Sequence, residues 1–168
     1  SFSVSDPAGN ATVGATVLAD TSVTYDRQVT YDATAPTLTL AQAADQVDPA
    51  KNAAIKFTLS ANETLDAATV TASDFTVTNG GTPTITGSGS SYTVTTTASG
   101  QGNVVIALSG TFSVSDPAGN AAATASGSDR TVTFDSVAPT LTLQQAAGQV
   151  DPAKNASIQF TLSSNETI

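Results

Sequence analysis

The sequence predicts an all-β fold made of tandem β-sandwich repeats, and three observations lead to this prediction. Thr, Ser, Ala, Val and Gly dominate the composition, and β-branched residues pack well on a pleated surface. Short runs in which apolar and polar residues alternate recur along the chain, with turn residues between them. Whole segments also recur at a spacing of about one small β domain, far longer than a solenoid unit.

The recurring segments set the expected domain boundaries. Residues 2–10 recur as residues 112–120, and three later segments recur 103 residues further on: 35–40 as 138–143, 47–53 as 150–156, and 62–64 as 165–167. The first copy carries seven extra residues between Asn10 and Asp32, which indicates a surface loop there. Ala-Pro pairs mark the junctions, because proline removes a ladder donor and stiffens a linker. We expect residues 1–33 to be the C-terminal part of one repeat, 34–136 a complete repeat, and 137–168 the first two strands of the next.

Seven strands are expected within the complete repeat. The second strand shows the pattern best, since Ile55, Phe57 and Leu59 point to one face and the residues between them to the other. Asn79-Gly80-Gly81 is a strong turn signal after the third strand. A helical turn is expected within residues 65–72. Seven short strands in about 100 residues favour a β-sandwich. The expected strands are 37–40, 54–60, 75–78, 84–86, 92–97, 104–108 running on towards Val114, and 131–134.

The charge and composition of the chain also exclude several classes of function. The net charge is −9, from 14 acidic and 5 basic residues with no His, so nucleic acid and anionic membranes are poor partners. Uncompensated carboxylates instead attract hard cations, of which Ca²⁺ is the usual one outside cells. There is no Cys, which excludes disulfides and thiolate metal sites. No apolar run approaches the roughly 20 residues of a membrane span, and we expect any secretion signal to lie elsewhere in a longer protein.

The order of these motifs resembles a known family over essentially the whole chain. Asp-Pro-Ala-Gly-Asn, a strand ending in Asp, Ala-Pro-Thr-Leu-Thr-Leu and then Asn-Glu-Thr are similar to the bacterial immunoglobulin-like tandem repeats of giant cell-surface adhesins, including biofilm-associated and RTX-type adhesins. The resemblance implies immunoglobulin-like seven-stranded β-sandwich repeats in tandem. It also implies an extracellular extender or spacer that holds a ligand-binding tip away from the cell. Neighbouring repeats of the same chain are the implied partners, and Ca²⁺ stiffens the junctions in several such families. Other copies of the chain are the expected partners in the alternative of a filament.

A Ca²⁺ site is expected at each repeat junction. Because strand direction alternates, the loops after the second and sixth strands lie at the end where the first strand begins, together with the last residues of the preceding repeat. Carboxylate and carboxamide oxygens, which Ca²⁺ prefers, gather there. The candidate ligands are Asp32, Asn62, Glu63, Asp116 and Asn120 at the first junction, and Asp135, Asn165 and Glu166 at the second.

Structural explanations for the same residues remain open. Asp116-Pro117-Ala118-Gly119 fits a type I turn position by position. Glu63 lies in a polar loop where solvated carboxylates are usual, and Asp32 and Asp135 fit strand-end charges that face water. At the opposite end of the repeat, a turn explains Asp48 better than metal binding does.

Catalysis is not expected, because no His or Cys is present to activate or replace a hydroxyl nucleophile. Two other functions stay open beside the extender. One is a self-assembling filament or sheath subunit whose incomplete ends are completed by strand addition between chains. The other is a carbohydrate- or receptor-binding module, although the only large polar aromatics are Tyr25, Tyr31 and Tyr92, with no Trp.

Overall fold

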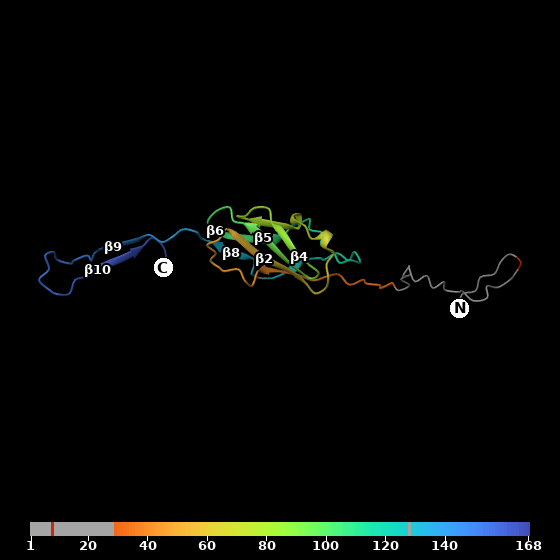
Figure 1. Ribbon diagram of the computed structural model, residues 1–168, viewed down its shortest axis with the longest axis horizontal. Helices are drawn as coiled ribbons and strands as arrows, with labels where there is room; N and C mark the ends of the chain where they lie inside the picture. The colour runs from red at the N-terminus through yellow and green to blue at the C-terminus, as the bar shows by residue number, and fades with distance from the viewer. Residues whose placement is uncertain (1–7, 9–28, 128) are drawn as a thin grey trace, which may run out of the picture. The chain divides into compact units, whose positions relative to one another are not determined.

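The computed structural model describes residue 8, residues 29–127 and residues 129–168. In these residues the fold is all-β, with strands in several sheets and two short 3₁₀ helices (Figure 1). The chain divides into two units, Ser1–Asp32 and Ala33–Ile168, and every described strand belongs to the second. Within the described ranges, neither helix has the length to cross a membrane.

The larger sheet has five strands in the order β4-β5-β2-β1-β7. The central strand of this sheet, β2, has side chains that alternate strictly between the core and the outer face. Ile55, Phe57 and Leu59 are fully buried, and the residues between them are partly exposed. β1 pairs antiparallel with β2 on one side and parallel with β7 on the other. The strands are β1 (Leu38–Gln42), β2 (Ala54–Ala61), β4 (Thr84–Ser88), β5 (Ser91–Thr97) and β7 (Ala125–Ser126).

A second sheet has three antiparallel strands in the order β3-β6-β8: β3 (Phe75–Thr78), β6 (Gly102–Leu108) and β8 (Thr131–Phe134). Its inward side chains belong to the same hydrophobic core as those of the five-stranded sheet. Val104 and Val132 are fully buried in this core together with Phe57 and Val94 of the larger sheet. The two sheets therefore exclude water from one shared interior, which supplies most of the driving force for folding.

Most of the expected strands are found within two residues of their predicted bounds, and β3 matches exactly at both ends. Two expectations were wrong. The sixth strand does not run on towards Val114, because Ser109 N–H bonds Asp74 O at 2.8 Å and a turn follows it. An eighth strand, β7, was also missed. The expected helical turn is present as the 3₁₀ helix Ala67–Thr69, and a second one, Ala72–Asp74, follows it.

Asp74 is a buried carboxylate that anchors the loop after β6. It is 2% exposed, and its Oδ2 accepts hydrogen bonds from both the N–H and the hydroxyl of Thr71, each at 2.7 Å. Its Oδ1 accepts from Ser113 N–H at 2.9 Å, across 39 residues of sequence. Asp74 thereby fixes the start of the segment that carries Asp116.

Residues after β8 form a hairpin of their own, from β9 (Leu141–Gln145) and β10 (Phe160–Ser164). Its register repeats that of β1 and β2: Leu143 pairs with Leu162, as Leu40 pairs with Leu59. The burial differs, however. Leu143 is 67% exposed, whereas Leu40 is 0% exposed.

Candidate metal site

Asn62 fixes the start of the loop that carries Glu63. Its Oδ1 accepts a hydrogen bond from Thr37 N–H at 2.7 Å, and its own N–H donates to Thr37 O at 3.2 Å. These two bonds tie the end of β2 to the residue just before β1. The amide oxygen that was predicted to bind a metal therefore already accepts a backbone hydrogen bond, which gives Asn62 a structural role.

Asp116 is the start of a tight turn, as the turn interpretation predicted. Gly119 N–H bonds Asp116 O at 3.1 Å, and Gly119 has a φ of 89°, a conformation that favours glycine. The side chain is 2% exposed, and both of its oxygens accept from Asn120: Oδ1 from the backbone N–H and Oδ2 from Nδ2, each at 2.8 Å. Asn120 thus holds the carboxylate in place.

Electrostatics keep Asp116 ionised. The Asn120 side-chain hydrogen bond is the largest effect on its pKa and lowers it, and the backbone N–H groups of residues 118–120 lower it further. Burial acts in the opposite direction, but the net pKa lies below the ordinary aspartate value. Each carboxylate oxygen has two lone pairs, so the anion that Asn120 orients can still bind a cation.

Backbone contacts hold the Glu63 and Asp116 loops together. Asp66 N–H donates to Ser115 O at 2.8 Å, and Ser115 N–H donates to the Thr69 hydroxyl at 3.1 Å. One carboxylate oxygen of Glu63 lies within 4.8 Å of one from Asp116. The prediction that these two loops meet near the start of the first strand is therefore confirmed.

Glu63 carries an unusual oxygen atom. Its Oε1 is buried and has no hydrogen-bond partner, and the same is true of Oε1 in Glu166. Among the described residues only one other side-chain atom is in this condition, the hydroxyl oxygen of Tyr92. Glu63 and Glu166 are half-buried, and an occluded carboxylate oxygen without a partner is costly, so a positively charged partner would stabilise each of these oxygens.

Asp32 is exposed and is the last residue of the first unit. Glu63 and Asp116 are the acidic pair of the second unit that could hold a metal ion, and Asp32 directly precedes that unit in the sequence as the third acidic residue of the proposed group. Three carboxylates offer hard oxygen ligands, which suit Ca²⁺ and other hard divalent cations alike.

The residues expected at the second junction have local roles. Asp135 Oδ1 accepts from Val137 N–H at 3.0 Å, just after β8 ends. Asn165 Oδ1 accepts from Thr140 N–H at 2.5 Å, as Asn62 does from Thr37. Over the described ranges, neither Asp135 nor Glu166 belongs to a group of three acidic side chains.

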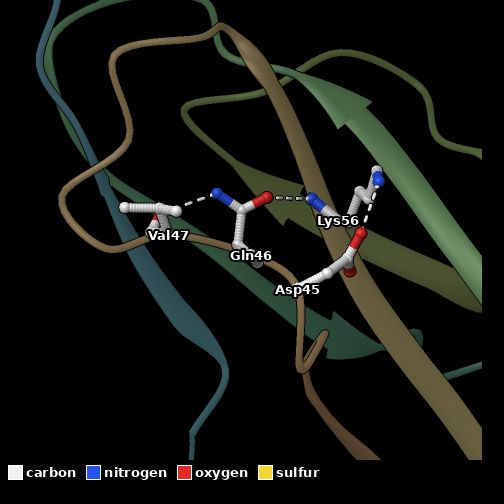
Figure 2. A network of polar contacts seen from close by, with 4 residues as sticks. All are labelled: Asp45, Gln46, Val47 and Lys56. Carbon is white, nitrogen blue, oxygen red and sulfur yellow. Dashed lines mark hydrogen bonds and ion pairs between the residues drawn. The ribbon is translucent and has the colours of Figure 1, made fainter.

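At the opposite end of the two sheets, polar side chains organise the loop between β1 and β2. Asp48 Oδ1 accepts from Thr133 N–H at 2.9 Å, which joins this loop to β8. Gln46 bridges the loop: its Oε1 accepts from Lys56 N–H at 2.9 Å and its Nε2 donates to Val47 O at 2.8 Å. Figure 2 shows this network, together with the ion pair between Lys56 Nζ and Asp45 Oδ2 at 2.7 Å.

We expect Lys56→Gln to lower stability slightly at neutral pH and to have no effect in acid. The hydrogen bond and the charge of Lys56 hold the pKa of Asp45 below its ordinary value, so the pair stabilises the fold above that value. This contribution is lost as the pH falls through the pKa of folded Asp45. The effect is small because the pair is exposed.

Urea midpoints of the wild type and the variant, measured from pH 7 to pH 3, check this expectation. Asp45→Asn should cause the same loss at pH 7, and the double variant should add nothing further. Gln159 and Gly148 stand at the corresponding positions of the β9–β10 hairpin, so glutamine is already accepted in this setting. A gap between wild type and Lys56→Gln that persists at pH 3 would show that packing, and not charge, is responsible.

The chain matches no known protein family, no curated protein and no solved structure.

Proposed function

We propose that the chain is a structural extender of a bacterial cell-surface adhesin or extracellular filament, built from tandem immunoglobulin-like β-sandwich repeats with Ca²⁺-stiffened junctions. The sandwich architecture is supported by two antiparallel-rich sheets that share one core over about 100 residues. Tandem repetition is supported by segments that recur 103 residues apart and by the common register of β1–β2 and β9–β10. This role requires no catalysis, and the chain has no His or Cys.

The observation that carries the metal part of the proposal is the buried, unpartnered Oε1 of Glu63 beside the ionised Asp116. Like charges this close repel one another, and a bound cation removes that repulsion and gives Oε1 a partner. The carboxylates of Asp32, Glu63 and Asp116 would hold the ion, and Asn120 would orient Asp116. A hard oxygen donor set of this kind fits Ca²⁺.

The position of Asp32 in the chain explains how binding would act on the junction. Asp32 lies five residues before Thr37, the residue that Asn62 ties to the end of β2. An ion shared by Asp32 and the two loops would restrict the segment that enters β1. Adjacent repeats would then be held more rigidly, as an extender under tension requires.

Thermal unfolding with Ca²⁺ and then with chelator tests this proposal. We expect Ca²⁺ to stabilise the fold by about 2.7 kcal/mol at a hundredfold excess over Kd, since the ion binds only the folded junction. Extracellular Ca²⁺ modules often have Kd values of about 10⁻⁴ to 10⁻³ M, which sets the range of the titration. Glu63→Gln keeps the side-chain shape but removes the charge, and it should abolish most of the Ca²⁺ response.

Asp129→Asn is the matched control, because Asp129 is an exposed acid of the same repeat outside the three-residue group. This variant should keep the full response. Equal loss of response in both variants would indicate general charge screening. Identical melting of the wild type in Ca²⁺ and in chelator would remove the metal from the proposal and leave a plain spacer.

A further inference from the structure

Asn79 is the only asparagine in the sequence that is followed by glycine, and it begins the connection from β3 to β4. This connection passes from the three-stranded sheet to the five-stranded sheet, and the connection from β5 to β6 returns beside it, with Gly80 bridged to Ala98. Nδ2 of Asn79 donates to Gly100 O at 2.8 Å and to Gly102 O at 3.4 Å. The side-chain amide of Asn79 therefore holds the two connections together.

The backbone requires both residues of the Asn79-Gly80 pair. Asn79 has a φ of 57°, in the left-handed region that asparagine enters more readily than most residues with a side chain. A Cβ at position 80 would lie 2.7 Å from Val77 Cγ1 and 2.8 Å from Thr96 Oγ1. The Thr96 hydroxyl is held in place by its hydrogen bond to Gly81 O at 2.7 Å. Glycine is therefore the residue that fits at position 80.

The same pair is chemically reactive, because glycine has no side chain to hinder attack by its backbone nitrogen. The Gly80 nitrogen can attack Cγ of Asn79. The new N–Cγ bond replaces the bond from Cγ to Nδ2, and the amide leaves as ammonia with the proton from the Gly80 nitrogen. Water then opens the cyclic imide at either carbonyl. The product is aspartate or isoaspartate, and isoaspartate carries an extra methylene group in the backbone.

We propose that Asn79-Gly80 is a deamidation site that the folded protein protects and that reacts when the connection between β3 and β4 opens. Attack on Cγ requires the side-chain amide to turn towards the Gly80 nitrogen. In the folded protein this amide is directed to the other connection by its bonds to Gly100 O and Gly102 O, so those bonds must break first. The inference rests neither on the metal nor on the extender role proposed above.

Deamidation also prevents the opened connection from closing as before. Aspartate at position 79 is an acceptor without a donor, and it would face the carbonyl oxygens of Gly100 and Gly102. Oxygen atoms that carry negative charge repel one another at this distance. Isoaspartate would in addition displace Asn79 O, which accepts from Ser99 N–H at 3.0 Å. Opening of this connection would therefore become irreversible once the amide is lost.

The rate of deamidation in the complete chain tests the protection, in mildly alkaline buffer with chelator so that Ca²⁺ plays no part. Peptide mass mapping measures the product at residue 79, and a synthetic peptide of residues 75–84 gives the rate of the unprotected pair in the same buffer. We expect the folded chain to react about tenfold more slowly than the peptide, or slower still, because only the open fraction reacts. Added urea should bring the two rates together. Equal rates without urea, or a ratio that urea does not change, would overturn the proposal.

Asn79→Asp tests the consequence of the reaction. We expect a lower urea midpoint than that of the wild type, because the carboxylate faces two carbonyl oxygens. Asn103→Asp is the matched control: Asn103 is exposed, and its Oδ1 accepts from the Thr133 hydroxyl at 3.2 Å, a bond that aspartate keeps. Equal midpoints of the two variants would overturn the irreversible step. The rate measurement uses the unaltered chain, so it stands even if Asn79→Asp does not fold.

Discussion

Phe57→Ala is expected to lower the free energy of unfolding of the two packed sheets by about 3 to 5 kcal/mol. Phe57 is 0% exposed at the centre of β2, where it packs in the core that both sheets share. The substitution removes a buried aromatic ring, so its hydrophobic contribution is lost. It also leaves a cavity that the surrounding strands fill only in part. Urea unfolding followed by circular dichroism measures the loss.

Phe160→Ala is the matched control, because Phe160 stands at the same position of the β9–β10 hairpin but is 63% exposed. We expect this substitution to change the stability of the two packed sheets by about 0.5 kcal/mol or less. Equal losses in both variants would mean that the hairpin is packed against apolar surface in solution.

Asp74→Ala is expected to cost about 3 kcal/mol. The substitution removes the three hydrogen bonds that the buried carboxylate accepts, from the N–H and the hydroxyl of Thr71 and from Ser113 N–H, and each contributes about 1 kcal/mol. The loop that begins at Ser113 should loosen as well, and with it the position of Asp116. The affinity of the proposed Ca²⁺ site should therefore fall together with stability, as calorimetric titration of the variant would measure.

Asp66→Ala provides the comparison for Asp74→Ala. Asp66 caps the first 3₁₀ helix through a single bond to Ala68 N–H at 3.0 Å, so its loss should cost about 1 kcal/mol. If both variants lost the same stability, the contact between Asp74 and Ser113 would not be the anchor of the loop.

Strand positions could be predicted from the sequence because they depend on a local pattern. The alternation of Ile55, Phe57 and Leu59 sets which face of β2 is buried, whatever lies opposite. Turn residues such as Asn79, which has a φ of 57°, mark where a strand must end. The outward direction of Lys56 followed from the same alternation, although its partner Asp45 did not.

Elements created by distant partners could not be predicted in this way. β7 is a two-residue strand that exists because β1 lies parallel to it. Gly127, just after it, has a φ of 124°, and a Cβ there would lie 2.1 Å from Leu40 O. Only glycine allows the backbone of residue 127 to come this close to Leu40 O. Nothing in the local sequence indicates that Leu40 is the neighbouring residue. The role of Asp74 was missed for the same reason, since Ser113 is 39 residues away.

The candidate site also combines features that could be predicted from the sequence with features that could not. Alternating strand direction was enough to predict that the loops of Glu63 and Asp116 meet at one end of the two sheets. The tertiary structure alone decided how each oxygen is used: Asn120 occupies both oxygens of Asp116, Thr37 takes the amide oxygen of Asn62, and Oε1 of Glu63 is left without a partner. Strand direction follows from the order of elements, whereas a hydrogen bond forms or fails on differences of a few tenths of an ångström in the donor–acceptor distance, which no local pattern in the sequence specifies.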